Sequence, residues 1–323
     1  MALVSVIIPC YNAEKYIVKC LESMQNQTFR DFNVIVVDDY STDDSQKIII
    51  DYKNNCNFEL LLEKNENNSG PAISRNKGVL LSDAKYIAYC DSDDWYEDNY
   101  LELMVQKANE NDADMVFCAH KKVDADGKVI SIQNVDINNQ NISVNTALSI
   151  GADSLCSIMI KKEIVLKVPQ PDLRCGEDMA VIPLMIMESK KFSVVNEPIY
   201  NYFCRAGSLS LSSTEKTVEN LQFSFAYIEQ NKVSGYENEI EFIGIKNLIY
   251  GALLNLFKFS NDKDKAKYIL FKFEEKYPLW YKNNYIRNLQ VYKRIFLWAA
   301  RKRCFFLLKL LSKTHKLLTE KSK

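Results

Sequence analysis

Short apolar runs alternate with helix-like patterns through the first 120 residues. The apolar runs are rich in Val, Ile, Phe and Tyr and indicate buried strands, whereas the segments between them have the apolar spacing of amphipathic helices. The expected strands are Val4–Pro9, Phe32–Asp38, Phe58–Leu62, Tyr86–Cys90 and Met115–Ala119, and the expected helices are Ala13–Gln25, Asp43–Lys53, Ala72–Leu81 and Asp98–Asn109. This alternation predicts βαβ units and a mostly parallel sheet flanked by helices, an α/β fold.

Polar residues gather where the expected strands end. Four such segments follow four successive strands: Pro9–Asn12, Asp38–Ser41, Asn65–Gly70 and Asp91–Asp94. Because the carboxyl ends of parallel strands share one edge of a sheet, and open α/β sheets bind ligands at that edge, the four segments predict a single binding site.

The pattern changes after residue 120. Asp124–Gly127 separates two β-prone runs and predicts a hairpin turn, and residues 133–152 are Asn-rich and predict a weakly structured loop. Glu177-Asp178 precedes an apolar helix, Met179–Met187, which two further strands follow, Phe192–Val195 and Ile199–Phe203. From about Ser213 the pattern is helical to the end, with a break at Pro278. We expect a sheet domain over 1–212 and an all-helical C-terminal extension over 213–323.

Charged residues are also distributed unevenly between the first and last parts of the chain. Residues 245–323 hold 19 Lys and Arg against 5 Asp and Glu, whereas residues 1–244 hold 22 against 37. The nine cysteines show no paired or metal-ligand spacing, which favours a reducing, cytoplasmic compartment. The chain enters an expected strand at Leu3 without a basic leader, and no apolar run reaches the length of a membrane span, so neither a signal peptide nor a spanning helix is expected.

Asp91-Ser92-Asp93-Asp94 carries the strongest chemical signal. Three carboxylates at the end of a buried strand repel one another, and burying them unpaired is costly. Carboxylate oxygens suit Mg²⁺ or Mn²⁺, which often carry a diphosphate. The alternative is a solvated acidic turn that caps a helix beginning at Trp95-Tyr96-Glu97.

Four blocks together resemble the family 2 glycosyltransferases with a GT-A fold. They are Ser5–Asn12, Val36–Asp43, Gly70–Gly78 and Asp91–Asp94, in the order and spacing of that family, and the resemblance covers roughly residues 3–210. It implies a nucleotide-diphospho-sugar donor, a divalent metal and inversion at the anomeric carbon.

The resemblance also implies roles for the nucleoside side of the site. Asp39 would accept a hydrogen bond from the uracil imide N–H, and Pro9, Tyr11, Asn12 and Glu14 would line the nucleoside pocket. The alternatives are a turn aspartate that bonds its own backbone for Asp39, a core aromatic for Tyr11 and a cap of the following helix for Glu14.

For the diphosphate and sugar, the resemblance points to the next two blocks. Gly70, Arg75 and Asn76 would border the nucleotide, with Arg75 either neutralising diphosphate or pairing with the acidic segment; a surface arginine is the alternative. Asp91 and Ser92 would contact the donor, and Asp93 together with Asp91 would bind the metal, Mg²⁺ or Mn²⁺.

Two more residues complete the expected site. Asp178 would be the general base that deprotonates the acceptor hydroxyl, although its position also suits a simple helix cap. Arg205 lies in a late segment, Tyr200–Ser208, that resembles a donor-closing loop and would meet the diphosphate.

The basic C-terminal region has a composition of its own. In residues 293–318 Lys and Arg alternate with Phe296, Trp298, Phe305 and Phe306, which is typical of a helix lying on an anionic membrane surface. The alternative is a helix packed on the protein with a solvated basic face. No nucleic-acid motif accompanies the charge, so no nucleic-acid partner is expected.

We therefore expect a metal-dependent, inverting transferase that moves a single sugar from a UDP-sugar to a cell-surface polysaccharide or lipid-linked glycan, at the inner face of the cell membrane. The Gln-x-x-Arg-Trp motif typical of processive synthases in the family is absent, which favours single transfer. The alternatives are a sugar-nucleotide-forming nucleotidyltransferase, disfavoured because Pro9–Asn12 lacks a glycine-rich loop, and a non-catalytic membrane scaffold.

Overall fold

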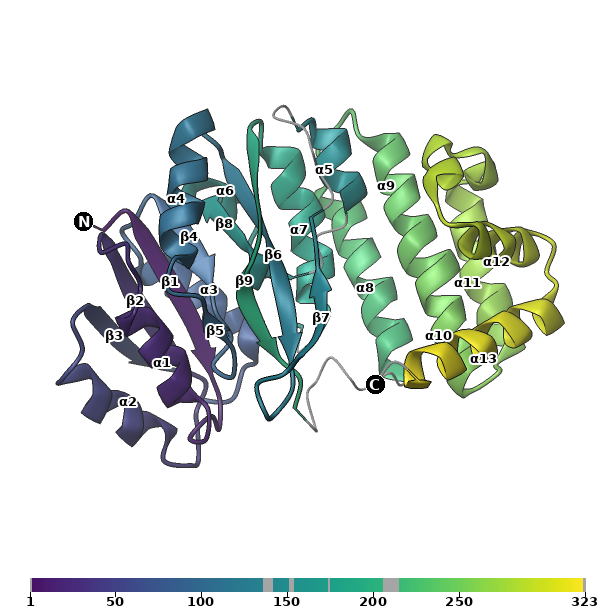
Figure 1. Cartoon of the computed structure of the whole chain (residues 1–323). Coiled ribbons are helices and arrows are strands. Elements are labelled where there is room, and N and C mark those ends of the chain that lie inside the picture. Colours follow the sequence, from purple (N-terminus) through teal and green to yellow (C-terminus); the bar gives the residue numbers. More distant parts are fainter. Residues whose placement is uncertain (1, 136–141, 151–153, 174, 206–214, 322–323) are drawn as a thin grey trace. The chain divides into compact units, whose positions relative to one another are not determined.

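The structure is a computed structural model that describes residues 2–135, 142–150, 154–173, 175–205 and 215–321. The chain divides into two compact units, Met1–Ala206 and Gly207–Lys323. The first contains the sheet and the second is helical (Figure 1).

Unit 1 is built on a mixed, mostly parallel sheet in the order β3-β2-β1-β4-β8-β6-β9-β5, with β7 paired to β6. The strands β1 to β4, β6 and β9 run in one direction, and the short strands β5, β7 and β8 run against them. Every residue of the central strand β1 is buried, as expected for a parallel strand covered on both faces. The bounds are β1 Val4–Cys10, β2 Phe32–Asp38, β3 Glu59–Lys64, β4 Tyr86–Tyr89, β5 Trp95–Tyr96, β6 Met115–Val123, β7 Val129–Gln133, β8 Ile158–Lys161 and β9 Phe192–Phe203.

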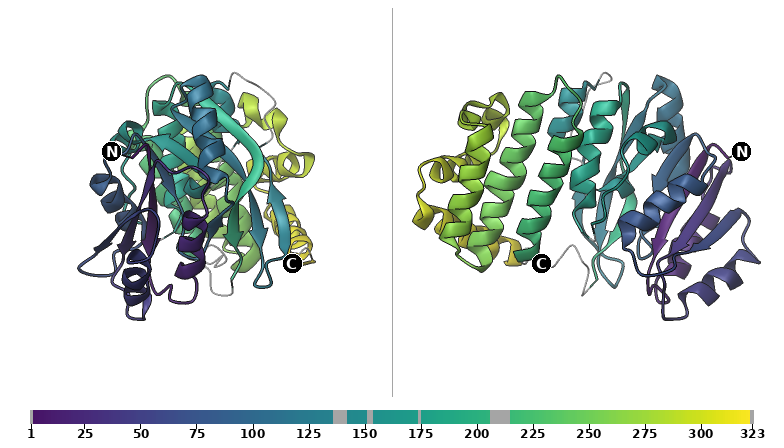
Figure 2. Two further views of the ribbon diagram at one scale, coloured as in Figure 1. Left: turned by 60° about the vertical axis from the view of Figure 1, so that its left-hand side comes forward. Right: turned by 180° about the vertical axis from the view of Figure 1, so that it is seen from behind.

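Helices cover both faces of this sheet. The helices α1 and α2 lie together on one face, whereas α3 crosses β1 and β2 on the other, as the view from behind shows (Figure 2). The sheet order explains this: the chain steps outward from β1 to β3 and then returns to β4, and right-handed crossovers place the returning helix on the opposite face. The bounds are α1 Ile17–Gln25, α2 Ser45–Lys53, α3 Pro71–Leu81, α4 Tyr100–Asn111, α5 Val144–Ile150, η1 Leu155–Ser157, α6 Lys162–Lys167 and α7 Glu177–Glu188.

The strands expected before residue 120 are present, and the Asp124–Gly127 turn joins β6 to β7 as a hairpin. The helix expected over Asp98–Asn109 is present as α4, but the helix start that the solvated-turn alternative placed at Trp95-Tyr96-Glu97 is wrong. Trp95-Tyr96 is the strand β5, which pairs with Tyr200 and Asn201 of β9, and α4 begins only at Tyr100. This pairing joins segments more than 100 residues apart, and no local pattern signals it.

Other departures follow β6. The two strands expected over 192–203 form one strand, β9, whose register shifts beside Cys118 and Ala119. The strand β8, between β4 and β6, and the helix α6 were not expected. The loop expected over 133–152 contains the helix α5 in its described part.

Unit 2 is helical throughout its described residues, as expected. Its core is formed by large apolar side chains, including Ile228, Ile249, Leu253, Phe257 and Phe296. The bounds are α8 Glu215–Asn231, α9 Glu237–Gly244, η3 Ile245–Ala252, α10 Leu253–Phe259, α11 Lys263–Lys276, η4 Trp280–Lys282, η5 Asn284–Asn288, α12 Val291–Arg301 and α13 Phe305–Lys321. The break expected at Pro278 lies between α11 and η4.

The continuous helical run Glu237–Phe259 is long and apolar enough to cross a membrane by length and composition. Of its most apolar window, 72% is buried inside the structure, which also fits a core helix. Its middle section, η3, is π-helical.

Candidate functional site

The candidate site forms where β1, β2 and β4 end. The loops after β1 and β2 are joined by side-chain to backbone hydrogen bonds. Asn12 Oδ1 accepts from Thr42 N (2.9 Å), and Glu14 Oε2 accepts from Asp44 N (3.2 Å). Glu14 therefore holds the start of α2 rather than capping α1, so its cap alternative is wrong. Tyr11 is 48% exposed, which excludes the core-aromatic alternative and leaves its ring free to stack, and Pro9 is buried within β1.

Asp39, directly after β2, is 3% exposed. Its Oδ1 accepts from Asn65 Nδ2 (2.8 Å) and Ser69 N (2.9 Å), and its Oδ2 accepts from Gly70 N (2.7 Å). Gly70 has φ of 90°, a conformation that favours glycine, and it directly precedes α3. Asp39 thus positions the loop that leads into α3, and its base-binding role stays a prediction.

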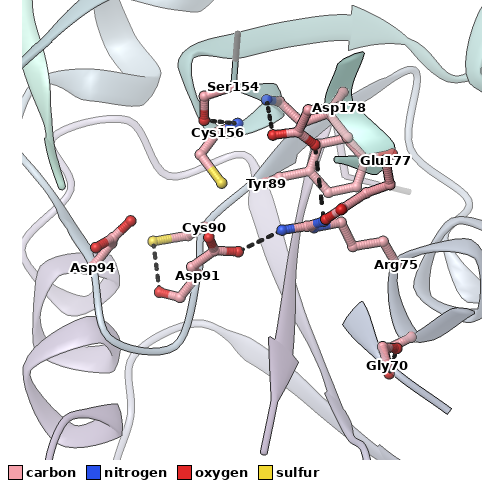
Figure 3. A network of polar contacts seen from close by, with 12 residues as sticks. Gly70, Arg75, Tyr89, Cys90, Asp91, Asp94, Ser154, Cys156, Glu177 and Asp178 are labelled. Atoms are coloured by element: carbon pink, nitrogen blue, oxygen red, sulfur yellow. Dashed lines mark hydrogen bonds and ion pairs between the residues drawn. The ribbon is translucent and has the colours of Figure 1, made fainter. Parts of the chain in front are cut away.

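Arg75 is the central residue of the site. It lies on α3 with 4% of its side chain exposed, so the surface-arginine alternative is wrong. One terminal nitrogen donates to Asp91 Oδ1 (2.7 Å), and the other donates to Glu177 Oε1 (2.7 Å) (Figure 3). Burial alone would lower the pKa of Arg75, but the carboxylates of Asp91, Glu177 and Asp178 raise it well above its ordinary value. Arg75 therefore remains charged and connects the end of β4 to the start of α7.

Asp178 lies in the first turn of α7. Its Oδ2 accepts from Leu155 N (3.3 Å), outside its own helix. Its Oδ1 is 4.0 Å from Arg75, is buried and has no hydrogen-bond partner among the described residues. Burial, followed by the charge of Glu177, raises the pKa of Asp178 to about 8, against the lowering effect of Arg75. A carboxylate with a pKa near neutrality and an unused oxygen has the properties of a general base.

Asp93 and Asp94 differ in their surroundings. Asp94 is 2% exposed; its Oδ1 accepts from Phe203 N (2.7 Å) and its Oδ2 from the Tyr200 hydroxyl. Asp93 is 20% exposed on its side chain and accepts from Arg205 Nε (2.5 Å). Burial and the charge of Asp91 raise the pKa of Asp93, against the lowering effect of Arg205. The solvated-turn alternative for this segment is therefore wrong.

Two sequence-predicted residues have other surroundings. Asn76 on α3 exchanges hydrogen bonds with the backbone of Gln170, donating to its carbonyl (2.8 Å) and accepting from its N–H (2.9 Å). It holds the segment after α6 in place. Ser92 is half-buried in the turn between Asp91 and Asp93. Arg205 meets Asp93, so the structure brings this late residue to the expected acidic segment.

Glu177 and Tyr200 have roles that were not expected from the sequence. Glu177 is 6% exposed and is the buried counter-charge of Arg75, and Tyr200 bonds the buried Asp94. Glu177 stands in the expected Glu-Asp pair, so its acidic type beside a predicted base was the available signal. The Tyr200 contact spans 106 positions and had no local signal.

Asp91 and Asp93 are the expected donors for a divalent ion. Among the described residues, no group of three or more His, Cys, Asp or Glu is arranged to hold a metal. Asp91 and Asp93 nevertheless supply two carboxylates with hard oxygen donors, one in contact with Arg75 and the other with Arg205. Mg²⁺ is commonly held by one or two carboxylates and by substrate phosphates, so the residues fit an ion that arrives with a diphosphate.

Comparison with known proteins places this site in a family. The family model described as glycosyl transferase family 2 matches residues 5–168, half of the chain. GlyG, a glycosyltransferase of Streptococcus pneumoniae, is 30% identical over 219 residues, which cover 64% of this chain and 72% of GlyG. The poly(ribitol-phosphate) beta-glucosyltransferase of Bacillus spizizenii is 28% identical over 222 residues, 67% of this chain but 34% of that longer protein.

Solved structures agree on the fold. Residues 1–349 of S. aureus TarS superpose with a TM-score of 0.70 at 20% identity, over 98% of this chain and 92% of that one, and TarS has also been solved with UDP-GlcNAc. A Pyrobaculum calidifontis mannosyltransferase, solved with GDP-Man and Mn²⁺, has a TM-score of 0.55 at 11% identity, over 97% and 87%. The expected mostly parallel GT-A-like sheet with a helical C-terminal region is confirmed. The chain belongs to glycosyl transferase family 2 and is a transferase enzyme related to those of teichoic acid and polysaccharide synthesis.

Proposed function

We propose that the protein transfers a single sugar from a UDP-sugar to a hydroxyl of a cell-surface polysaccharide or lipid-linked glycan, with inversion and with Mg²⁺ or Mn²⁺. The observation that carries this proposal is the unpartnered, buried Oδ1 of Asp178. It belongs to a carboxylate whose pKa is raised to about 8, and it lies 4.0 Å from the arginine that also binds Asp91. The side chain of Arg75 therefore lies between the candidate base, Asp178, and Asp91, which belongs to the candidate site for the leaving group.

A single base is sufficient for an inverting displacement. The Asp178 carboxylate accepts the proton of the acceptor hydroxyl while the hydroxyl oxygen forms a bond to the anomeric carbon of the donor sugar. The bond from that carbon to the diphosphate oxygen breaks on the opposite face, and the nucleoside diphosphate leaves with the electron pair. No second carboxylate is needed as a nucleophile, in contrast to a retaining glycosidase.

The neighbouring residues keep the base ready. Leu155 N fixes one oxygen of Asp178, which orients the other. Arg75 is held by Glu177 and Asp91, so its charge is fixed in place before any substrate arrives. Arg205 and Asp93 flank the expected diphosphate position, and a divalent ion bound by Asp93 and Asp91 would neutralise the charge of the leaving group.

The relatives support the choice of donor. TarS has been solved with UDP-GlcNAc, and a UDP-sugar would place uracil beside Asp39 and the exposed ring of Tyr11. The nucleoside pocket would then be lined by Pro9, Tyr11, Asn12, Glu14 and Asp39, with Gly70, Asn76, Asp91 and Ser92 nearer the diphosphate and sugar.

Replacing the base tests the proposal. In Asp178→Asn the amide keeps the size of the side chain and can still accept from Leu155 N, but it cannot take a proton. We expect transfer to fall by at least about 10²-fold, the usual scale of a general base, with UDP-sugar affinity changed little. Transfer is measured as UDP release with acceptor and Mn²⁺, and binding by calorimetry. Unchanged turnover in this variant would overturn the role of Asp178.

A further inference from the structure

The helix α12 presents an apolar stripe on its outward side. Val291, Ile295 and Trp298 are 61%, 44% and 54% exposed, and their spacing of four and three residues places them on one side of the helix. Together with Arg294 they line a shallow hollow in the surface. Arg301 and Lys302, also exposed, extend this side at the end of the helix. We call these six residues the α12 outer face.

This exposed stripe is not the side of α12 that packs into the core of its own unit. The inward side of α12 is a separate apolar surface formed by Phe296, Leu297, Ala299 and Ala300, all nearly fully buried. A surface helix needs one apolar side to pack on its own domain. An additional, contiguous apolar side rimmed by charge marks an interaction site.

The structure also corrects the sequence-based expectation for this region. Phe296, which we expected to face a membrane, is 1% exposed and belongs to the core, whereas Trp298 and Phe306 are exposed. The packed-helix alternative is therefore right for one side of α12, and the opposite side remains open.

The positive charge of this region favours an anionic partner. Residues 291–318 contain eight Lys and Arg and no Asp or Glu. Within the described residues, Arg294 and Lys302 have no carboxylate partner. The helix α11 provides a contrast, because its exposed Tyr268 and Phe271 lie among Lys–Asp and Lys–Glu ion pairs and its face carries little net charge.

We propose that the α12 outer face docks on an anionic phospholipid bilayer, with Val291, Ile295 and Trp298 in the interfacial region and the basic residues at the headgroups. A soluble polyanion would use the basic residues but leave the apolar stripe in water. A second copy of this face would bring like charges together. Anionic lipid matches both the apolar and the basic side chains.

Bilayer docking would bring the enzyme to a lipid-linked acceptor at the inner face of the membrane, and only this purpose rests on the proposed function. Bilayer binding itself requires none of the residues around Arg75 and Asp178. Loss of vesicle binding with intact UDP-sugar turnover would therefore refute this inference alone, and the reverse result would refute the proposed function alone.

The experiment measures co-sedimentation of the full chain with vesicles of phosphatidylcholine, with and without about 30% phosphatidylglycerol. We expect binding to the anionic vesicles and at least about ten-fold weaker binding to the neutral ones. Ile295→Ser/Trp298→Ser should lose about ten-fold or more in affinity through lost apolar insertion. Arg294→Gln/Lys302→Gln should lose about 30-fold and much of the salt dependence. Tyr268→Ser/Phe271→Ser on α11, which removes exposed aromatic area elsewhere, should bind as the unmodified chain does.

Three results would overturn the proposal. The first is no binding to anionic vesicles, or equal binding to neutral ones. The second is unchanged vesicle binding in Ile295→Ser/Trp298→Ser. If soluble polyphosphate then binds to the unmodified chain and to Ile295→Ser/Trp298→Ser but not to Arg294→Gln/Lys302→Gln, the face is assigned to a polyanion. The third is self-association in sedimentation velocity that Ile295→Ser/Trp298→Ser abolishes while vesicle binding persists, which would assign it to a second copy. Circular dichroism of each variant confirms that the chain remains folded.

Discussion

At the scale of single residues, the site is defined by how four charged groups share one buried region. Arg75 contacts Asp91 and Glu177 directly and lies 4.0 Å from Asp178. Three carboxylates around one guanidinium leave excess negative charge, and the unpartnered oxygen belongs to Asp178. The raised pKa of Asp178 follows from burial and this excess. Arg75 donates hydrogen bonds to Glu177 and Asp91 but not to Asp178, so Asp178 keeps its affinity for a proton.

The raised pKa of Asp178 has a consequence for stability. An ordinary Asp has a pKa near 4, so between about pH 4 and pH 8 the folded protein holds a proton that the unfolded chain releases, and stability falls as pH rises through this window. Asp178→Asn does not titrate there. The measured quantity is the melting temperature of Asp178→Asn minus that of the unmodified protein. We expect this difference to increase by at least about 4 °C between pH 5 and pH 8.5.

The measurement is thermal unfolding followed by circular dichroism across that range without ligand. Asp126→Asn, in the exposed β6–β7 turn, is the matched control and should show no such change. Parallel melting curves for Asp178→Asn and the unmodified protein at every pH would contradict the raised pKa.

At the scale of elements, the position of α3 on the sheet sets the position of Arg75. The helix begins at Pro71, directly after Gly70, which is held by Asp39, and it crosses β1 at Gly78. A Cβ atom on Gly78 would lie 2.5 Å from Cγ2 of Ile7, whose side chain is fully buried. The glycine therefore allows the close approach of helix and strand that places Arg75 between Asp91 and Glu177.

We predict that Gly78→Ala weakens both stability and transfer. The added methyl group requires α3 to move away from β1, at a cost of about 1–3 kcal/mol, and the gain in helix propensity of about 1 kcal/mol leaves a net loss of up to about 2 kcal/mol. The displacement should lower turnover because it moves Arg75. Urea unfolding and UDP release measure the two effects. Leu80→Ala, at a 73% exposed position of the same helix, should change neither, and a fully stable, fully active Gly78→Ala would show that α3 does not set the site.

At the scale of the whole molecule, the two proposed tasks fall on different units. All residues of the proposed donor site, from Pro9 to Arg205, belong to Met1–Ala206, whereas the α12 outer face belongs to Gly207–Lys323. The charge of the sequence divides in the same sense, acidic before residue 245 and basic after it. Donor chemistry and membrane recruitment can therefore be tested separately in the full chain.

We predict that UDP and Mn²⁺ together stabilise the protein more than either alone. A ligand at 100 times its dissociation constant adds about 2.7 kcal/mol to the folded state that binds it. Asp93→Asn should lose most of the Mn²⁺-dependent part, because the amide is a weaker ligand, while Asp126→Asn should keep it. Thermal shift with UDP, Mn²⁺ and both provides the measurement. Equal shifts for UDP with and without Mn²⁺ would argue against a metal shared with the diphosphate.

The alternation of strands and helices could be predicted from the sequence alone, and so could the four polar strand ends, including Asp91 and Asp93. Asp178 and Arg205 became site candidates only through the family resemblance. The alternation and the strand ends are local signals: apolar periodicity depends on neighbours a few positions away, and charged residues at a buried strand end require a partner whatever the partner is. Their roles as binding and metal residues came from resemblance and stay predictions, as do the domain limits.

The pairing of these residues was decided only by tertiary structure. Arg75 meets Glu177 across 102 positions, and β5 meets β9 although its sequence suggested a helix. Contacts of this range depend on sheet order and on where β8 inserts, which no local window contains. The same holds for α12, where amphipathic composition predicted the helix but only packing decided that Phe296 is buried and Trp298 is exposed. Local patterns specify which residues need partners, and the free energy of the whole fold selects those partners.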